Sequence, residues 1–234
     1  MSGTVKLWVV LACLAACAGS SPPPSATATA STHSTPEATN DAATRYRRGD
    51  YVIYRYRDRS GLNVLLEETI ERVEGNRLWI HVVARRGAEQ REWIQVVTDT
   101  PENRDANIVD ELIEIQGDTR IPLANEGNRD MFRLYRWTLP PCGSPHDPAA
   151  PVTRSVSVAD GECDATCVSF GLECGHAPAR LEACDCDEFL WTHATAAVWI
   201  AGDDDPIWEV DVVAQGNDDP PVTGRLPRPE WLEP

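Results

Sequence analysis

Lysine is almost absent from this sequence of 234 residues: only Lys6 is present, and all other cationic side chains are arginines. Basic residues are also outnumbered, with Lys+Arg 21 against Asp+Glu 37 and a formal net charge of −16. Proteins that bind nucleic acids need a clustered basic face. The charge balance therefore argues against a nucleic-acid partner.

Recognisable catalytic motifs are missing as well. The sequence contains no Gly-x-Ser-x-Gly elbow, phosphate loop, dinucleotide fingerprint or His-Glu-x-x-His helix. His81 is expected to be packed on a strand or to lie at its rim, whereas His33, His146 and His193 have no partner at a catalytic spacing. We therefore expect no enzymatic activity and no catalytic residues. An enzyme of unfamiliar type is the weakest of three hypotheses.

Hydrophobic runs are short, and the longest near the N-terminus is Leu7–Leu14. Spanning a bilayer takes about 20 apolar residues, so this run matches the core of a signal peptide rather than a transmembrane helix. The residues that follow, Leu14-Ala15-Ala16-Cys17, resemble the lipobox of bacterial lipoproteins over residues 1–17. The resemblance implies cleavage before Cys17 and acylation of this residue with chains such as palmitate. Ala18, in place of an aspartate, implies an outer-membrane destination.

A tether follows the lipobox. Residues 18–44 consist almost wholly of Ala, Ser, Thr and Pro and contain no large aliphatic or aromatic side chain. Such a segment cannot bury enough surface to offset the entropy of ordering, so we expect it to be disordered. As a flexible coil it would span about 30 Å.

From Arg45 onward, short bursts of aromatic and β-branched residues predict strands. The alternation over 52–57 places Val52, Tyr54 and Tyr56 on one face of a strand, and strands are also predicted over 62–73, 78–83, 93–98, 194–201 and 207–214. Met131–Leu139 is predicted to be a further strand. Over 105–117 a helix and a strand remain alternatives. Long amphipathic helices are lacking, so we expect a mainly β protein, either an antiparallel sandwich or an open half-barrel with at most two short helices.

Six cysteines remain when Cys13, in the signal peptide, and Cys17 are set aside. An even number in an exported chain predicts three disulfides that hold a small cysteine-rich insert. Excluding the very tight Cys184–Cys186 ring leaves twelve of the fifteen pairings open. A zinc site using thiolates and His176 is the alternative interpretation. The six residues are Cys142, Cys163, Cys167, Cys174, Cys184 and Cys186.

Acidic residues concentrate in the second half of the chain. Residues 45–141 contain 16 Arg and 17 acids, whereas residues 142–234 contain four Arg and 18 acids. Two acidic turns flank the last predicted strand and need not converge. Carboxylates clustered in turns can bind Ca²⁺, so they are weak calcium candidates, although solvated loops are the commoner outcome. The candidates are Asp203, Asp204, Asp205, Asp218 and Asp219.

The predicted organisation has six parts: signal peptide 1–16, acylated tether 17–44, main β-domain 45–141, cysteine-rich insert 142–190, closing strands 191–216 and Pro-rich tail 217–234. The favoured function is a non-enzymatic, lipid-anchored envelope protein that binds a protein or polysaccharide partner. A carrier that holds a lipid or acyl chain in a concave sheet is the alternative, and it requires an apolar cavity of several hundred Å³. Seven tryptophans are expected to be core or rim residues, and some could stack on a ligand: Trp79, Trp93, Trp137, Trp191, Trp199, Trp208 and Trp231.

Overall fold

The computed structural model describes residues 46–100, 102–103, 108–124, 129–159, 161–186, 194–222 and 226. Within these residues, no helix is long and apolar enough to cross a membrane. Several predictions lie outside the described residues: the signal peptide, Cys17, the tether, His33, Trp191, His193 and Trp231.

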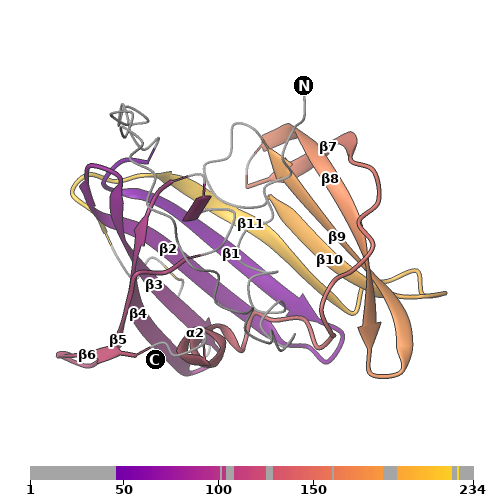
Figure 1. The fold of residues 1–234 in the computed structure, drawn as a ribbon, viewed down its shortest axis with the longest axis horizontal. Helices are drawn as coiled ribbons and strands as arrows, with labels where there is room; N and C mark the ends of the chain where they lie inside the picture. The colour runs from indigo at the N-terminus through magenta and orange to yellow at the C-terminus, as the bar shows by residue number, and fades with distance from the viewer. Residues whose placement is uncertain are drawn as a thin grey trace, which may run out of the picture.

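The described chain forms one antiparallel sheet of 11 strands in the order β6-β5-β4-β3-β2-β1-β11-β10-β9-β8-β7. Figure 1 shows that this sheet is strongly curved and open. The prediction of a mainly β fold is confirmed, and of the two predicted architectures the open sheet is present. The strands are β1 (Asp50–Asp58), β2 (Asn63–Glu74), β3 (Arg77–Arg86), β4 (Glu89–Thr98), β5 (Glu111–Gln116), β6 (Thr119–Leu123), β7 (Val152–Val158), β8 (Gly161–Cys174), β9 (Ala177–Cys186), β10 (Thr195–Ile200) and β11 (Trp208–Asn217).

Neighbouring strands in the sheet are consecutive in the chain, except that β1 pairs with β11. Gly75 and Gly87 occupy the turns between β2 and β3 and between β3 and β4, with φ of 60° and 56°. Glycine is favoured at such left-handed positions because it lacks a Cβ. The strands β2, β3 and β4 are thus joined as two successive hairpins.

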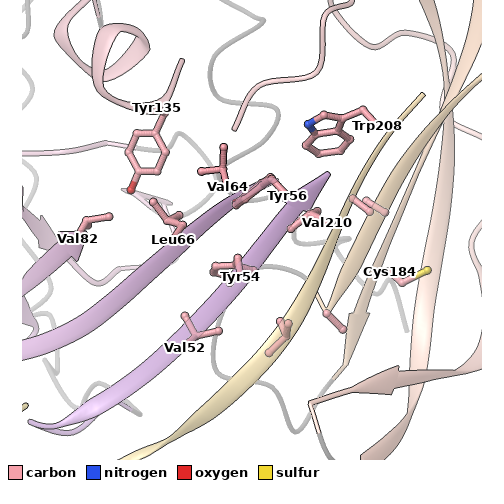
Figure 2. Close-up of a cluster of buried hydrophobic side chains, with 14 of the residues drawn as sticks. Val52, Tyr54, Tyr56, Val64, Leu66, Val82, Tyr135, Cys184, Trp208 and Val210 are labelled. Carbon is pink, nitrogen blue, oxygen red and sulfur yellow. The ribbon is translucent and has the colours of Figure 1, made fainter. Parts of the chain in front are cut away.

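One face of the sheet, here called the core face, carries most of the buried side chains. Val52, Tyr54 and Tyr56 of β1 are 0%, 4% and 2% exposed, which confirms the predicted alternation. Figure 2 shows these three side chains on the same side as Leu66 and Val210, with Trp208 near Tyr56. The opposite side of the sheet is called the outer face.

A short helix, α2 (Arg129–Tyr135), packs on the core face. The ring of Tyr135 meets Trp93 of β4 edge to face at a centroid distance of 4.9 Å. The predicted strand over Met131–Leu139 is therefore wrong. Met131, Leu134 and Tyr135 are spaced i, i+3, i+4, the spacing that places side chains on one side of a helix. Over 105–117 the strand alternative holds, because Glu111–Gln116 forms β5 and Leu112 is buried.

The cysteine-containing segment contributes β7, β8 and β9 to the same sheet. Its three disulfides join Cys142 to Cys174, Cys163 to Cys186, and Cys167 to Cys184. This pairing is one of the twelve left open by the sequence. Cys167 and Cys184 lie directly opposite each other on β8 and β9, which explains why these two residues pair. Because all six cysteines are bonded, none provides the thiolate that the zinc alternative requires.

Candidate functional site

A pocket of about 450 Å³ lies between β7 and the outer face of β9, β10 and β11. β7 is the last strand of the sheet, yet it returns toward β11, where the Ala159 amide donates to the Val212 carbonyl at 3.0 Å. One wall of the pocket is thus β7, and the strands opposite it form the floor. The lining residues are Arg154, Ser155, Val156, Ser157, Glu182, Thr195, Ala196, Ala197, Trp199, Glu209, Val210 and Asp211.

Alternation along β10 and β11 explains which side chains reach this floor. On β10, Ala196 and Val198 are buried in the core, so Thr195, Ala197 and Trp199 face the other way and are half-buried. On β11 the same alternation buries Trp208, Val210 and Val212 and turns Glu209 and Asp211 to the outer face. The sequence pattern contains this alternation, but it does not show that β7 lies opposite.

Two arginines of β1 hold the floor carboxylates in place. Arg57 contacts Glu209 at 3.1 Å and Asp211 at 2.6 Å, and Arg55 contacts Asp211 at 3.3 Å. Both guanidinium groups use Oδ2 of Asp211, and among the described residues Oδ1 has no donor. Oε2 of Glu209 likewise has no donor in the described part of the chain. The floor therefore presents two oriented acceptor atoms.

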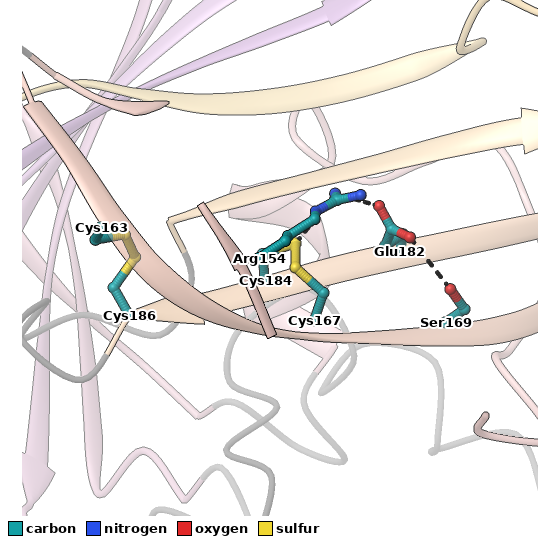
Figure 3. The surroundings of a disulfide bond; sticks show 7 residues. All are labelled: Arg154, Cys163, Cys167, Ser169, Glu182, Cys184 and Cys186. Carbon is teal, nitrogen blue, oxygen red and sulfur yellow. Dashed lines mark hydrogen bonds and ion pairs between the residues drawn. A yellow bond between two sulfur atoms is a disulfide. The ribbon is translucent and has the colours of Figure 1, made fainter. Parts of the chain in front are cut away.

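A second charged group ties β7 to the floor. Arg154 donates to Oε1 of Glu182, and Ser169 donates to Oε2 of the same carboxylate at 3.3 Å. The Arg154 guanidinium also lies 3.4 Å from Sγ of Cys184, beside the Cys167–Cys184 disulfide (Figure 3). Glu182 thus has both oxygens occupied, and two disulfides join β8 and β9, the strands that carry Ser169 and Glu182.

Trp199 provides the aromatic wall of the pocket. Its ring is half-buried, and the guanidinium of Arg180 lies 4.8 Å from the ring centroid. Three other tryptophans, at 93, 137 and 208, are buried as the core residues that the sequence predicted. Trp79 also lies on the outer face, where Arg72 and Arg77 contact its ring at 4.3 and 5.2 Å. Of the five described tryptophans, Trp199 is the one that lines the pocket.

The five calcium candidates are not brought together. Asp203 pairs with Arg59 at 2.6 Å, and Asp219 pairs with Arg48 at 3.6 Å. These turns lie at opposite ends of β11, because Asp203 precedes the strand and Asp219 follows it. Among the described residues, no group of three His, Cys, Asp or Glu side chains is arranged to hold a metal ion.

His81 lies between two carboxylates on the outer face, away from the pocket. Its Nδ1 is 3.0 Å from Glu71 and its Nε2 is 2.7 Å from Glu92, and the residue is 6% exposed. Burial alone would lower the pKa of His81, but the two carboxylates outweigh it and raise the pKa above its ordinary value. The expected packed or rim histidine is thus confirmed as a packed one. His146 contacts Gly171 instead, and His176 stands in an exposed turn.

A buried carboxyl lies on the core face. Glu68 of β2 is 4% exposed and accepts a hydrogen bond from the Tyr135 hydroxyl at 3.0 Å. Burial raises the pKa of Glu68 to about 7, although the bond from Tyr135 works in the opposite direction. Neither Glu68 nor the pocket residues Arg154, Glu182, Glu209 and Asp211 were identified from the sequence. Charged side chains on strands usually face solvent, and the sequence carries no sign of the long-range packing that encloses them.

No protein-family model and no curated protein matches the chain. A predicted exported protein with a YmcC-like fold from Bacteroides fragilis is similar in structure, with a TM-score of 0.43 and 7% sequence identity, covering 75% of this chain and 99% of that one. A hypothetical protein from Chlamydia trachomatis aligns with a TM-score of 0.40 and 8% identity, covering 73% of this chain and 88% of that one. Neither similarity assigns a family or a function.

Proposed function

We propose that this chain is a lipid-anchored, non-enzymatic envelope protein that binds its partner in the pocket between β7 and β9–β11. The anchor is the acylated Cys17, and the likeness of Leu14-Ala15-Ala16-Cys17 to a lipobox supports it. Disulfides persist in oxidising compartments outside the cytoplasm, so the three bridges support export. Ala18 favours the outer membrane as the destination.

The pocket is the observation that carries the binding role. Its volume of about 450 Å³ lies in the range of small-molecule sites, which is about 300–1,000 Å³. It combines one aromatic wall with oriented polar groups, and the disulfides beside it reduce the flexibility of its frame. A preformed site of this kind binds with little cost of reorganisation.

The same observations weigh against the lipid carrier. That alternative needs an open apolar cavity on the concave sheet, but Tyr54, Tyr56, Trp208 and Tyr135 fill the core face (Figure 2). The pocket itself is lined by Arg, Ser, Glu, Thr and Asp side chains, which suit a polar ligand. An acyl chain would cover the acceptor atoms of Glu209 and Asp211 that have no donor among the described residues, at a cost of about 1–3 kcal/mol each.

Anchoring is tested by the Cys17→Ser substitution. We expect wild-type protein to incorporate labelled palmitate and to fractionate with membranes, and the variant to do neither. Cys13→Ser is the matched control, since Cys13 lies in the leader and should leave labelling unchanged. Labelling that survives Cys17→Ser, or soluble wild-type protein, would contradict the anchor.

Binding in the pocket is tested by filling it. Ala197 lies on the pocket floor, so Ala197→Phe places a ring in the cavity, whereas Ala201→Phe adds the same ring in an exposed turn. Each protein is purified from envelope fractions, and retained molecules are identified by native mass spectrometry. We expect wild type and Ala201→Phe to retain the same ligand and Ala197→Phe to lose it. Equal retention by all three proteins would refute a role for the pocket.

A further inference from the structure

We propose that the ligand is an uncharged saccharide of one or two sugar rings, with Trp199 as the surface on which a ring stacks. This inference rests on the proposed role of the pocket as the binding site. It goes further because it assigns a chemical class to the ligand and separate roles to the floor and the wall.

The first argument is the excess of acceptors on the floor. Oδ1 of Asp211 and Oε2 of Glu209 have no donor among the described residues, and their partner oxygens are already held by Arg55 and Arg57. Carboxylate oxygens accept and never donate when ionised. A complementary ligand must therefore offer several donors, as the hydroxyl groups of a sugar do.

The Thr195 hydroxyl adds a group that can donate as well as accept. It lies on the same floor, and in the described part of the chain its side chain has no hydrogen-bond partner. Each sugar hydroxyl likewise donates once and accepts. Thr195 can thus return a hydrogen bond to a hydroxyl that donates to Asp211, which lies opposite Thr195 in the pairing of β10 and β11.

The second argument is the aromatic wall. A pyranose ring has an apolar face of C–H groups and a polar edge of hydroxyls, so it needs an aromatic plane beside hydrogen-bonding groups. Trp199 provides the plane, and it is close to the floor because Ala197, two residues before it on β10, lines the floor itself. Tryptophan is also the side chain that offers the largest rigid aromatic surface.

The third argument concerns charge. The charged lining residues are one arginine, Arg154, and three acids, Glu182, Glu209 and Asp211. The one pocket arginine, Arg154, is already paired with Glu182. A ligand bearing carboxylates or phosphates would therefore meet no unpaired cationic side chain among the described lining residues. The pocket therefore favours a saccharide without acidic groups.

The experiment measures saccharide binding by the full protein, purified in a detergent that carries no sugar headgroup. Isothermal titration compares neutral disaccharides with disaccharides containing a uronic acid. We expect at least one neutral disaccharide to bind, and Trp199→Ala to weaken its binding at least about tenfold. Asp211→Asn, which replaces an acceptor oxygen with a donor, should weaken it as well. Trp79→Ala is the matched control, because it removes another arginine-contacted tryptophan outside the pocket and should leave binding unchanged.

Thermal unfolding of each variant establishes that it is folded. Stronger binding of the acidic sugars, or equal binding by wild type and a folded Trp199→Ala variant, would overturn the inference. If no sugar binds and Ala197→Phe still abolishes retention of an envelope ligand, the sugar assignment fails and the proposed binding role stands. If Ala197→Phe also has no effect, both fail.

Discussion

The carboxyl group of Glu68 can be used to measure how burial in this sheet changes a pKa. It lies on the core face beneath α2, and its pKa is raised from 4.5 to about 7. The folded state therefore binds this proton more tightly than the unfolded chain does. The contribution to stability is complete below about pH 4.5 and is lost as the pH rises through about 7.

The substitution Glu68→Gln removes the titration and keeps the size of the side chain and an oxygen that can accept from Tyr135. A difference of about 2.5 pKa units corresponds to about 3 kcal/mol. We therefore expect the variant to match wild type at about pH 4 and to be more stable by about 3 kcal/mol at about pH 8. Urea unfolding at a series of pH values gives the free energy of unfolding of both proteins.

Glu74→Gln is the control, because Glu74 is an exposed carboxyl on the same strand. It should change the free energy of unfolding by at most about 1 kcal/mol, because Glu74 and Arg72 form an exposed ion pair. If Glu68→Gln and wild type differ by the same amount at both ends of the pH range, burial does not raise the pKa of Glu68. The account of the core face would then be wrong.

Two further predictions concern other parts of the sheet. Gly49→Ala should reduce the free energy of unfolding by at least about 3 kcal/mol, because φ is +88° and the added Cβ would lie 2.2 Å from a main-chain oxygen. Gly61→Ala, at a φ of +85° with open space around it, should cost only about 1–2 kcal/mol, and equal losses in urea unfolding would contradict the steric argument. For His81, whose pKa is raised, the stabilisation by the charged form is present below the ordinary histidine pKa and is lost as the pH rises through the raised value. Glu71→Gln should lower the midpoint of the His81 titration measured by NMR. An unchanged midpoint would show that the Glu71 carboxylate does not raise the pKa of His81.

Strands could be predicted where one face is buried. Val52, Tyr54 and Tyr56 share one face of β1, and burial of this face fixes the register of the strand. The turns at Gly75 and Gly87 were predictable for a similarly local reason. Each depends on residues that are neighbours in the chain, so the sequence contains the information.

The helix α2 was mispredicted because a segment this short fits both the two-residue period of a strand and the 3.6-residue period of a helix. Over Met131–Leu139, aromatic residues favoured a strand, whereas packing of Leu134 and Tyr135 on the core face favours a helix. Tertiary contacts decide such cases, and the intrinsic preference is small. A segment of seven helical residues is too short for the periodicity to be distinctive.

The pocket could not be predicted, because its parts come from distant segments. Arg57 and Asp211 are 154 residues apart, and β8 and β9 separate β7 from β10 and β11 in the order of the sheet. Alternation along the predicted strand 207–214 puts Glu209 and Asp211 on its polar face. A polar face of a strand is usually exposed to solvent and does not line a pocket. Only the position of β7 opposite these strands distinguishes a pocket floor from a solvated face. No local sequence pattern predicts that position.

The unevenly distributed charges of the chain form ion pairs where β1 pairs with β11. Arginines of the first half meet the acids of the second half along this junction and in the turns that flank it. Exposed ion pairs each contribute little, about 0–1 kcal/mol, but wrong registers would place like charges opposite each other. The pairs therefore favour the register that joins the two halves into one sheet, and they include Asp203 and Asp219 of the flanking turns. They are Arg48–Asp219, Arg55–Asp211, Arg57–Glu209, Arg57–Asp211 and Arg59–Asp203.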